Sequence, residues 1–221
     1  MGVPMLVNVN IQVPLARLCE TDFFVPILAD VVAPGVFSSK EKREQAPTEY
    51  IVGRVFAQRM DWLLAKTMGY NPLAVCDAAS STWLQLYETL SNKRRNGFRK
   101  DLNLDTFIRE LFFVQEILLH PDIEDRLAVL DAVLSGMSGD NSLILMQHEP
   151  VAEHHLHGWE LRDLGFKKIA RSNFLLRDNR FRYPFGEAHY GGRSVDFAAT
   201  AEHEEWLLDH WDSLISHSPS P

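Results

Sequence analysis

The sequence predicts a mixed α/β protein, with a central sheet and helices packed on its faces. Between Thr106 and Asn179, apolar strand patterns alternate with helical ones in the order strand, helix, strand, helix, strand. The connections between them are short, and parallel neighbours need a crossover helix, so this order gives a mixed sheet flanked by helices. Hydrophobic residues make up 46% of the 221 residues, which is enough for a sizeable core.

The first element is a strand. Residues Leu6 to Val13 alternate apolar and polar side chains until Pro14, which is typical of a half-buried strand and suits the edge of the later sheet. Asp22 to Val32 is apolar and fits either a helix or a strand, although Pro26 argues against a long regular helix.

Helical patterns follow in the next part of the chain. Thr48 stands at a helix N-cap position, and apolar residues recur at helical spacing from Ile51 to Gly69, which predicts an amphipathic helix. Pro72 to Cys76 is a short apolar run that we interpret as a strand. Ser80 or Ser81 then caps a helix that extends to position 90.

The central elements come next. We expect a strand from Phe107 to Leu119, a helix from Ile123 to Met137, and a strand from Ser142 to Met146. A short helix ends in Leu164-Gly165-Phe166, and a third strand runs from Lys168 to Arg177. The Ser142–Met146 run is continuously apolar, so it should be central and buried on both faces.

A ligand crevice is expected beyond the carboxyl ends of these strands, around His120 to Arg126 and Gln147 to Pro150. The glycines and aromatic residues of Arg180 to Arg193 indicate turns with one short strand. Ala199 to Ser216 is a helix that should dock through Trp206, Leu207 and Trp211, since so large an apolar stripe would otherwise be an exposed patch; docking on a second copy of the chain would make a homodimer. We expect one domain over residues 1–216 and a disordered tail at 217–221.

Charge and composition exclude some classes of function. The formal net charge is −8, which argues against a general nucleic-acid binder. Asn92 to Asp101 nevertheless holds five cations, either as a solvated loop or as a contact for phosphate or an acidic partner. Cys19 and Cys76 form no paired motif, no apolar run is long enough to cross a membrane, and no leader precedes the chain, so a cytoplasmic protein is expected.

Part of the central region resembles a known family. The matching features are the strand Phe112 to Leu119 followed by His120-Pro121, the next helix, the strand Leu143 to Met146, and a helix closing on Leu164-Gly165-Phe166. Read together, Glu110 to Phe166 resembles the acyl-coenzyme-A-binding half of the GCN5-related N-acetyltransferase (GNAT) superfamily.

The resemblance implies a GNAT-like mixed central sheet, with extra helices in the N-terminal half, and an acyl-coenzyme-A-binding half at about 106–179. In that family the strand before the helix splays from its neighbour, and its free backbone groups pair with the pantetheine arm of acetyl-coenzyme A or another acyl-coenzyme A. The following helix N-terminus holds the pyrophosphate, since its first N–H groups are unpaired. Carried over, the cofactor-binding residues are Ile117, Leu118, Leu119, Arg126, Leu127 and Ala128.

Two departures from the family pattern favour an alternative. The loop Ile123 to Ala128 has no glycine and contains Glu124 and Asp125, and Leu161 stands where the family often has a tyrosine general acid. The chain is therefore either an acyl-coenzyme-A-dependent N-acyltransferase or a non-catalytic binding or regulatory module on the same scaffold. An unrelated α+β interaction protein is the third reading.

Three residues are candidates for catalysis. Glu116 lies among apolar strand neighbours, where burial would raise its pKa and suit it to act as a general base for an amine acceptor. The alternative without a function is a surface carboxylate that faces outward or is paired. His120 is either a base at the crevice or a turn residue before Pro121. His148 is expected to line the pocket for the acceptor, which is a small-molecule or a protein amine.

The histidines between Gln147 and His157 are of a residue type that often binds metal ions, so we consider a metal site there. There is no His-Glu-x-x-His motif, and His154 and His155 would point about 100° apart on a helix. We therefore predict no metal site.

Overall fold

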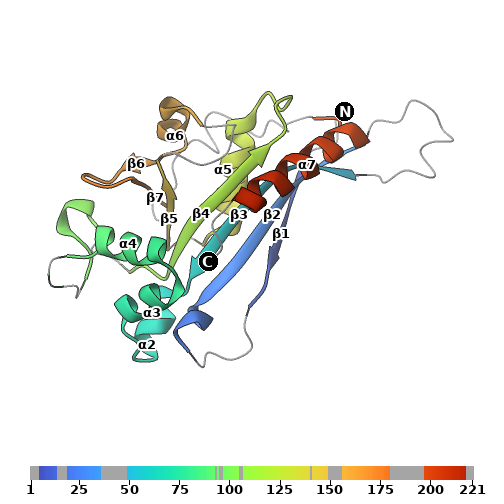
Figure 1. Cartoon of the computed structure of the whole chain (residues 1–221). Helices are drawn as coiled ribbons and strands as arrows, with labels where there is room; N and C mark the ends of the chain where they lie inside the picture. Colours follow the sequence, from blue (N-terminus) through green and yellow to red (C-terminus); the bar gives the residue numbers. More distant parts are fainter. Residues whose placement is uncertain are drawn as a thin grey trace.

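The computed structural model describes residues 5–13, 19–35, 49–92, 94, 97–104, 107–139, 141–148, 156–179 and 197–217. These residues form a seven-stranded sheet in the order β1-β2-β3-β4-β5-β7-β6 (Figure 1). The strands are β1 (Leu6–Ile11), β2 (Phe24–Pro34), β3 (Glu49–Met60), β4 (Glu110–Leu119), β5 (Ser142–Gln147), β6 (Lys167–Lys168) and β7 (Phe174–Asp178).

Only β4 and β5 pair in parallel; all the other neighbours in this sheet are antiparallel. The helix between β4 and β5 is the crossover that parallel pairing requires. The predicted mixed α/β class is therefore confirmed. The predicted strand from Lys168 to Arg177 is instead a hairpin, in which β7 turns back from β6 and lies antiparallel to β5.

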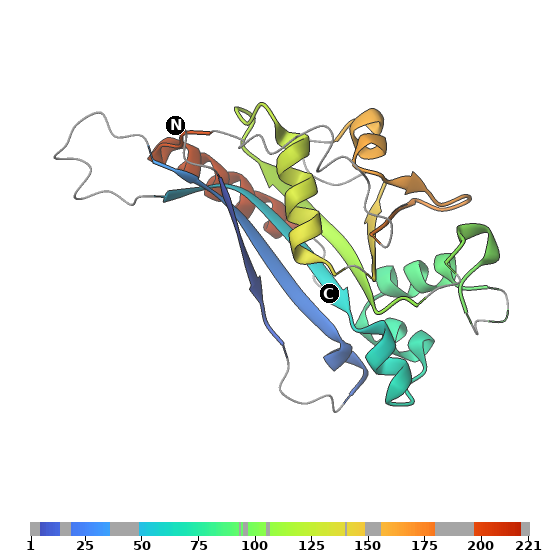
Figure 2. The ribbon, with the colours of Figure 1, turned by 180° about the vertical axis from the view of Figure 1, so that it is seen from behind.

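Helices cover both faces of the sheet. Helices α5 and α6 lie on one face (Figure 2), while α2, α3 and α4 cover one end of the other face and α7 covers its other end (Figure 1). Three separate cores result, one beneath each of these groups. The helices are η1 (Glu20–Phe23), α2 (Trp62–Thr67), α3 (Pro72–Ala79), α4 (Ser81–Leu90), η2 (Lys100–Leu102), α5 (Arg126–Met137), α6 (Gly158–Asp163) and α7 (Ala201–His217).

The predicted helix from Ile51 to Gly69 is wrong over most of its length. Residues 49–60 form β3, and only Trp62–Thr67 is helical. A bulge opposite Val31 and Val32 shifts the register of β3, and the strand is covered on both faces. A strand that is buried on both faces does not alternate apolar and polar side chains. The apolar residues of β3 therefore matched the spacing expected of a helix.

The predicted strand from Pro72 to Cys76 is also wrong, since these residues begin α3. Asn71 caps this helix by accepting the N–H of Leu73 at 3.0 Å, and Pro72 occupies the first helical position. Proline is favoured there because that N–H has no partner within a helix.

Other expectations hold. β1 is an edge strand, Asp22 to Val32 is mainly the strand β2, and Leu143, Ile144 and Leu145 are completely buried in a central β5. The predicted C-terminal helix docks on the sheet of its own chain through Leu207 and Trp211, so its apolar stripe gives no argument for a homodimer.

β4 starts at Glu110 rather than at Phe107, which is exposed. Thr48, Arg180 to Arg193 and the residues after His217 lie outside the described part of the chain. Among the described helices, none is both long and apolar enough to cross a membrane.

Candidate functional site

β4 and β5 run side by side over only part of the length of β4. Their pairing extends from Glu110 and Ser142 to Val114 and Met146, whereas β4 continues to Leu119. The last half of β4 therefore has β3 on one side and, among the residues that the structure describes, no paired strand on the other. This parting of the two strands lies at their carboxyl ends, where the crevice was expected.

A bulge in β4 falls at the same point. Phe56 of β3 lies opposite Glu116, and the next residue, Ala57, lies opposite Val114, so Gln115 is the extra residue. A bulge of this kind leaves one residue unpaired and reverses the faces to which the following side chains point.

The bulge decides where Glu116 lies. Val114 packs in the α5 core, and after the bulge Ile117 and Leu119 pack there as well, while Leu118 packs under α7. Because strand side chains alternate, Glu116 shares the α7 face with Leu118. Its side chain is buried, with 8% exposed. Without the bulge, this candidate base would point into the α5 core.

The backbone of this half-strand is oriented by its ladder with β3. The N–H of His120 donates to the carbonyl of Val52 at 2.8 Å. Antiparallel ladders bond every second residue, so Leu118 also directs its backbone groups to β3. Ile117 and Leu119 therefore direct theirs towards the opening between β4 and β5. Of the three strand residues predicted to bind a cofactor, these two have suitably placed backbone groups.

His120 is buried at the end of β4, beneath the first turns of α7. Its Nδ1 accepts the N–H of Asp122 at 3.2 Å, and its ring meets the rings of His203 and Trp206 edge-on, with centroids 4.5 and 4.7 Å apart. Nε2 of His203 lies 3.5 Å from Oδ2 of Asp122. This turn is thus the place where α7 attaches to β4.

His120, Asp122 and His203 also form a possible metal-ligand group, because one ligand atom of each lies within 4.8 Å of the others. The hydrogen bonds oppose that use. Nδ1 of His203 accepts the N–H of Thr200 at 2.8 Å, which places the proton of the neutral ring on Nε2, facing Asp122. A metal ion would have to displace that proton, so the geometry fits a helix attachment better than a metal centre.

Arg126, the residue predicted to contact the pyrophosphate, forms an ion pair with Glu160 instead. Nε of Arg126 lies 2.7 Å from Oε1 of Glu160, whose other oxygen accepts the N–H of His157 at 2.7 Å. Glu160 is buried, so the guanidinium of Arg126 joins α5 to α6. Of the other two predicted residues, Leu127 is partly buried against the α5 core and Ala128 is buried.

A cavity of about 550 Å³ lies at the end of β5, on the α4 side. It is lined by α4, the segment that follows it, the end of β5 and the turn between β6 and β7. His148 is not part of its lining; this residue is exposed, and its N–H donates to the carbonyl of Asn173 at 2.6 Å. The lining residues are Gln85, Glu88, Thr89, Arg99, Gln147, Arg171, Ser172, Asn173 and Phe174.

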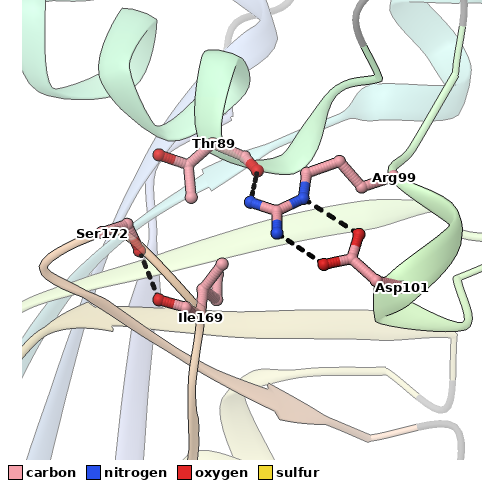
Figure 3. A network of polar contacts seen from close by, with 5 residues as sticks. All are labelled: Thr89, Arg99, Asp101, Ile169 and Ser172. Atoms are coloured by element: carbon pink, nitrogen blue, oxygen red, sulfur yellow. Dashed lines mark hydrogen bonds and ion pairs between the residues drawn. The ribbon is translucent and has the colours of Figure 1, made fainter.

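Arg99, from the basic segment, has a structural role on the cavity wall (Figure 3). Its Nε donates to Asp101 at 3.0 Å, a second nitrogen bonds the other carboxylate oxygen at 2.5 Å, and a third donates to the carbonyl of Thr89 at 3.3 Å. The hydrogen bond with Arg99 lowers the pKa of Asp101 and raises the pKa of Arg99. Arg99 therefore bonds a carbonyl of the last turn of α4, and its charge is balanced by Asp101.

We compared the chain with protein-family models, curated proteins and solved structures, and none of them matches it. The candidate site therefore rests on its own geometry. The sequence analysis did not predict the cavity. Its lining residues range from Gln85 to Phe174, 89 positions apart, and no sequence motif links these segments. The sequence analysis also missed His203, whose only signal was its place three residues after Thr200 at the start of a predicted helix.

Proposed function

We propose that this protein is an N-acyltransferase that uses an acyl-coenzyme A, such as acetyl-coenzyme A, and acylates an amine. The observation that carries the proposal is the parting of β4 from β5 after Val114 and Met146. Beyond that pair, β4 offers backbone groups of Ile117 and Leu119 towards the opening. An extended amide-containing arm could pair with such groups as an added strand does.

The residues present fit the arm better than they fit the pyrophosphate. The arm needs backbone donors and acceptors beside an apolar wall, and Ile117 and Leu119 provide both. The N-terminus of α5 follows closely after β4 and has unpaired N–H groups. However, Glu124 and Asp125 are exposed just before it, so we expect weak binding of the anionic end.

A bound acyl-coenzyme A would supply a thioester, whose carbon–sulfur bond would break as the bond from carbon to the amine nitrogen forms. The sulfur would leave as a thiolate, which takes up a proton from solvent in place of the one that the amine loses. The chain's own groups would assist at two atoms. Backbone N–H groups at the opening would stabilise charge on the carbonyl oxygen. The carboxylate of Glu116, which is buried on the sheet face that α4 and α7 cover, would accept the proton of the amine.

A second candidate is a non-catalytic module that has lost the cofactor. The observation that favours it is the ion pair between Arg126 and Glu160. Arg126 is the cation that was predicted to bind the pyrophosphate, and its charge is already balanced by Glu160. The two candidates share a fold and differ in whether acyl-coenzyme A binds.

Calorimetric titration with acetyl-coenzyme A separates the two candidates. The N-acyltransferase proposal predicts saturable binding that tightens when both loop carboxylates are neutralised in Glu124→Gln/Asp125→Asn, because like charge is removed from the anion's path. It also predicts that Glu116→Gln binds the ligand but no longer releases free thiol in the presence of an amine. The absence of any heat at millimolar ligand would refute the N-acyltransferase proposal.

A further inference from the structure

The cavity beside β5 is built for a polar ligand. Of the described residues that line it, all except Phe174 are polar or charged. Its volume of about 550 Å³ is within the range of roughly 300–1,000 Å³ usual for small-molecule sites. An apolar ligand would displace water from the amide and charged groups of the wall without replacing its hydrogen bonds, which is costly.

The cavity also borders the place where β4 and β5 separate. Gln147 on its wall directly follows Met146, the last β5 residue that pairs with β4, and Phe174 pairs with Gln147 from β7. The cavity opens on the α4 side of the sheet, the side to which Glu116 points. A ligand here would lie next to the opening that the proposed acyl transfer uses, so the inference below rests on that proposed function.

The turn between β6 and β7 brings Arg171 to the cavity in an unusual conformation. Its φ is 65°, in the left-handed region that favours glycine or asparagine. Ser172 holds the turn by donating its hydroxyl to the carbonyl of Ile169 at 3.0 Å (Figure 3). The same hydroxyl oxygen accepts the N–H of Phe174 at 3.2 Å. Non-glycine residues seldom adopt this backbone conformation, and those that do cluster at functional sites.

The two arginines of the cavity differ in the partners they already have. Arg99 is held by Asp101, so its charge is balanced. Arg171 is exposed, and no ion pair to it is found among the residues that the structure describes. Its guanidinium is therefore the cation with capacity for a ligand carboxylate, which it can bind through two parallel hydrogen bonds.

We propose that this cavity binds a free amino acid as the acceptor of the acyl group, with the ligand's carboxylate on Arg171. The lining also includes the carboxylate of Glu88, from α4, so the wall carries charges of both signs. The side-chain amides of Gln85, Gln147 and Asn173 provide neutral partners for a polar ligand. A ligand that carries both charges matches this lining better than a simple amine or a simple anion.

The test measures amino-acid binding to the full chain without acyl-coenzyme A. Each standard amino acid is added at millimolar concentration and followed by saturation-transfer NMR and thermal melting. We expect at least one to bind, and its carboxamide, which lacks the negative charge, to bind about tenfold or more weakly. Binding by none of them, or equal binding of acid and carboxamide, would overturn the proposal.

Two variants of Arg171 make the test independent of folding. Arg171→Gly and Arg171→Asn both suit the left-handed backbone, so neither should melt below the wild type, yet each should lose amino-acid affinity by about tenfold or more. Arg162→Gln, at an arginine on α6 whose side chain is 79% exposed, is the matched control and should bind normally. Unchanged affinity in both Arg171 variants would overturn the assignment.

The outcome is separable from the acyltransferase proposal. Amino-acid binding without acetyl-coenzyme A binding would refute the acyl transfer and keep the carboxylate site on Arg171. Acetyl-coenzyme A binding with no amino-acid binding would refute the acceptor assignment and keep the proposed use of β4.

Discussion

Val114 and Met146 are the last two residues that pair β4 with β5. One residue later, the bulge at Gln115 turns Glu116 to the face that α4 and α7 cover. The end of the pairing and the bulge act together. They direct backbone groups of β4 into the opening and place a buried carboxylate on the side of the polar cavity.

The attachment of α7 to the sheet should contribute strongly to stability. Trp211 is 4% exposed, packs with Leu118 and Leu207, and has the guanidinium of Arg54 5.4 Å from its ring centroid. Trp211→Ala should lower the free energy of unfolding by about 3–5 kcal/mol, measured by urea titration. Trp159→Ala, at a tryptophan that is 52% exposed, is the control and should lose under about 1 kcal/mol. Equal losses would mean that α7 does not dock here.

The link between α5 and α6 depends on one buried carboxylate. Glu160→Gln should destabilise the protein by about 1–3 kcal/mol, because Arg126 loses its counter-ion and the N–H of His157 loses a charged acceptor. Asp163→Asn removes only an exposed contact at 4.0 Å to Arg162 and should cost under about 0.5 kcal/mol in the same denaturant titration. A loss in Glu160→Gln as small as the control's would show that the pair does not join the helices.

The buried thiol of Cys76 predicts a loss of stability at alkaline pH. Burial raises its pKa from 9.0 to about 12. Between these values the unfolded chain has released a proton that the folded chain keeps, so stability falls by about 1.4 kcal/mol per pH unit. Below pH 9 the full contribution is present.

Urea titrations across this pH range check the sign of the Cys76 effect. The wild type should lose stability more steeply with rising pH than Cys76→Ala, which has no thiol to ionise. Parallel slopes for the two proteins would contradict the assignment. The same burial should protect Cys76 from alkylation at neutral pH, while the exposed Cys19 reacts.

The way in which each element is buried explains whether its sequence pattern predicted it correctly. β5 and α7 were predicted correctly, because β5 is a short apolar run after a crossover helix and α7 has an apolar stripe at helical spacing. β3 was taken for a helix because it is covered on both faces and bulged, which removes the alternation of a strand. The turn that carries Arg171 was missed because nothing local shows that an arginine adopts a left-handed backbone.

The site was predicted in part. Glu116 was chosen for its apolar neighbours, but only the bulge at Gln115 determines the face on which it lies. The pairing of Arg126 with Glu160 joins residues 34 positions apart, and no pattern near Arg126 reveals it. Long-range pairings of this kind depend on how α6 packs beside α5.

The central claim is that the backbone of β4 beyond Val114 receives the arm of an acyl-coenzyme A. Ile117→Pro tests it most directly, because proline removes an N–H that faces the opening and not one that bonds β3. Ile117→Ala is the matched control for loss of the side chain, and circular dichroism confirms that both variants fold. In calorimetric titrations with acetyl-coenzyme A, the account predicts that the alanine variant binds and the proline variant binds at least about tenfold more weakly than it. Equal affinities in the two variants, or no binding by the wild type at millimolar ligand, would contradict it.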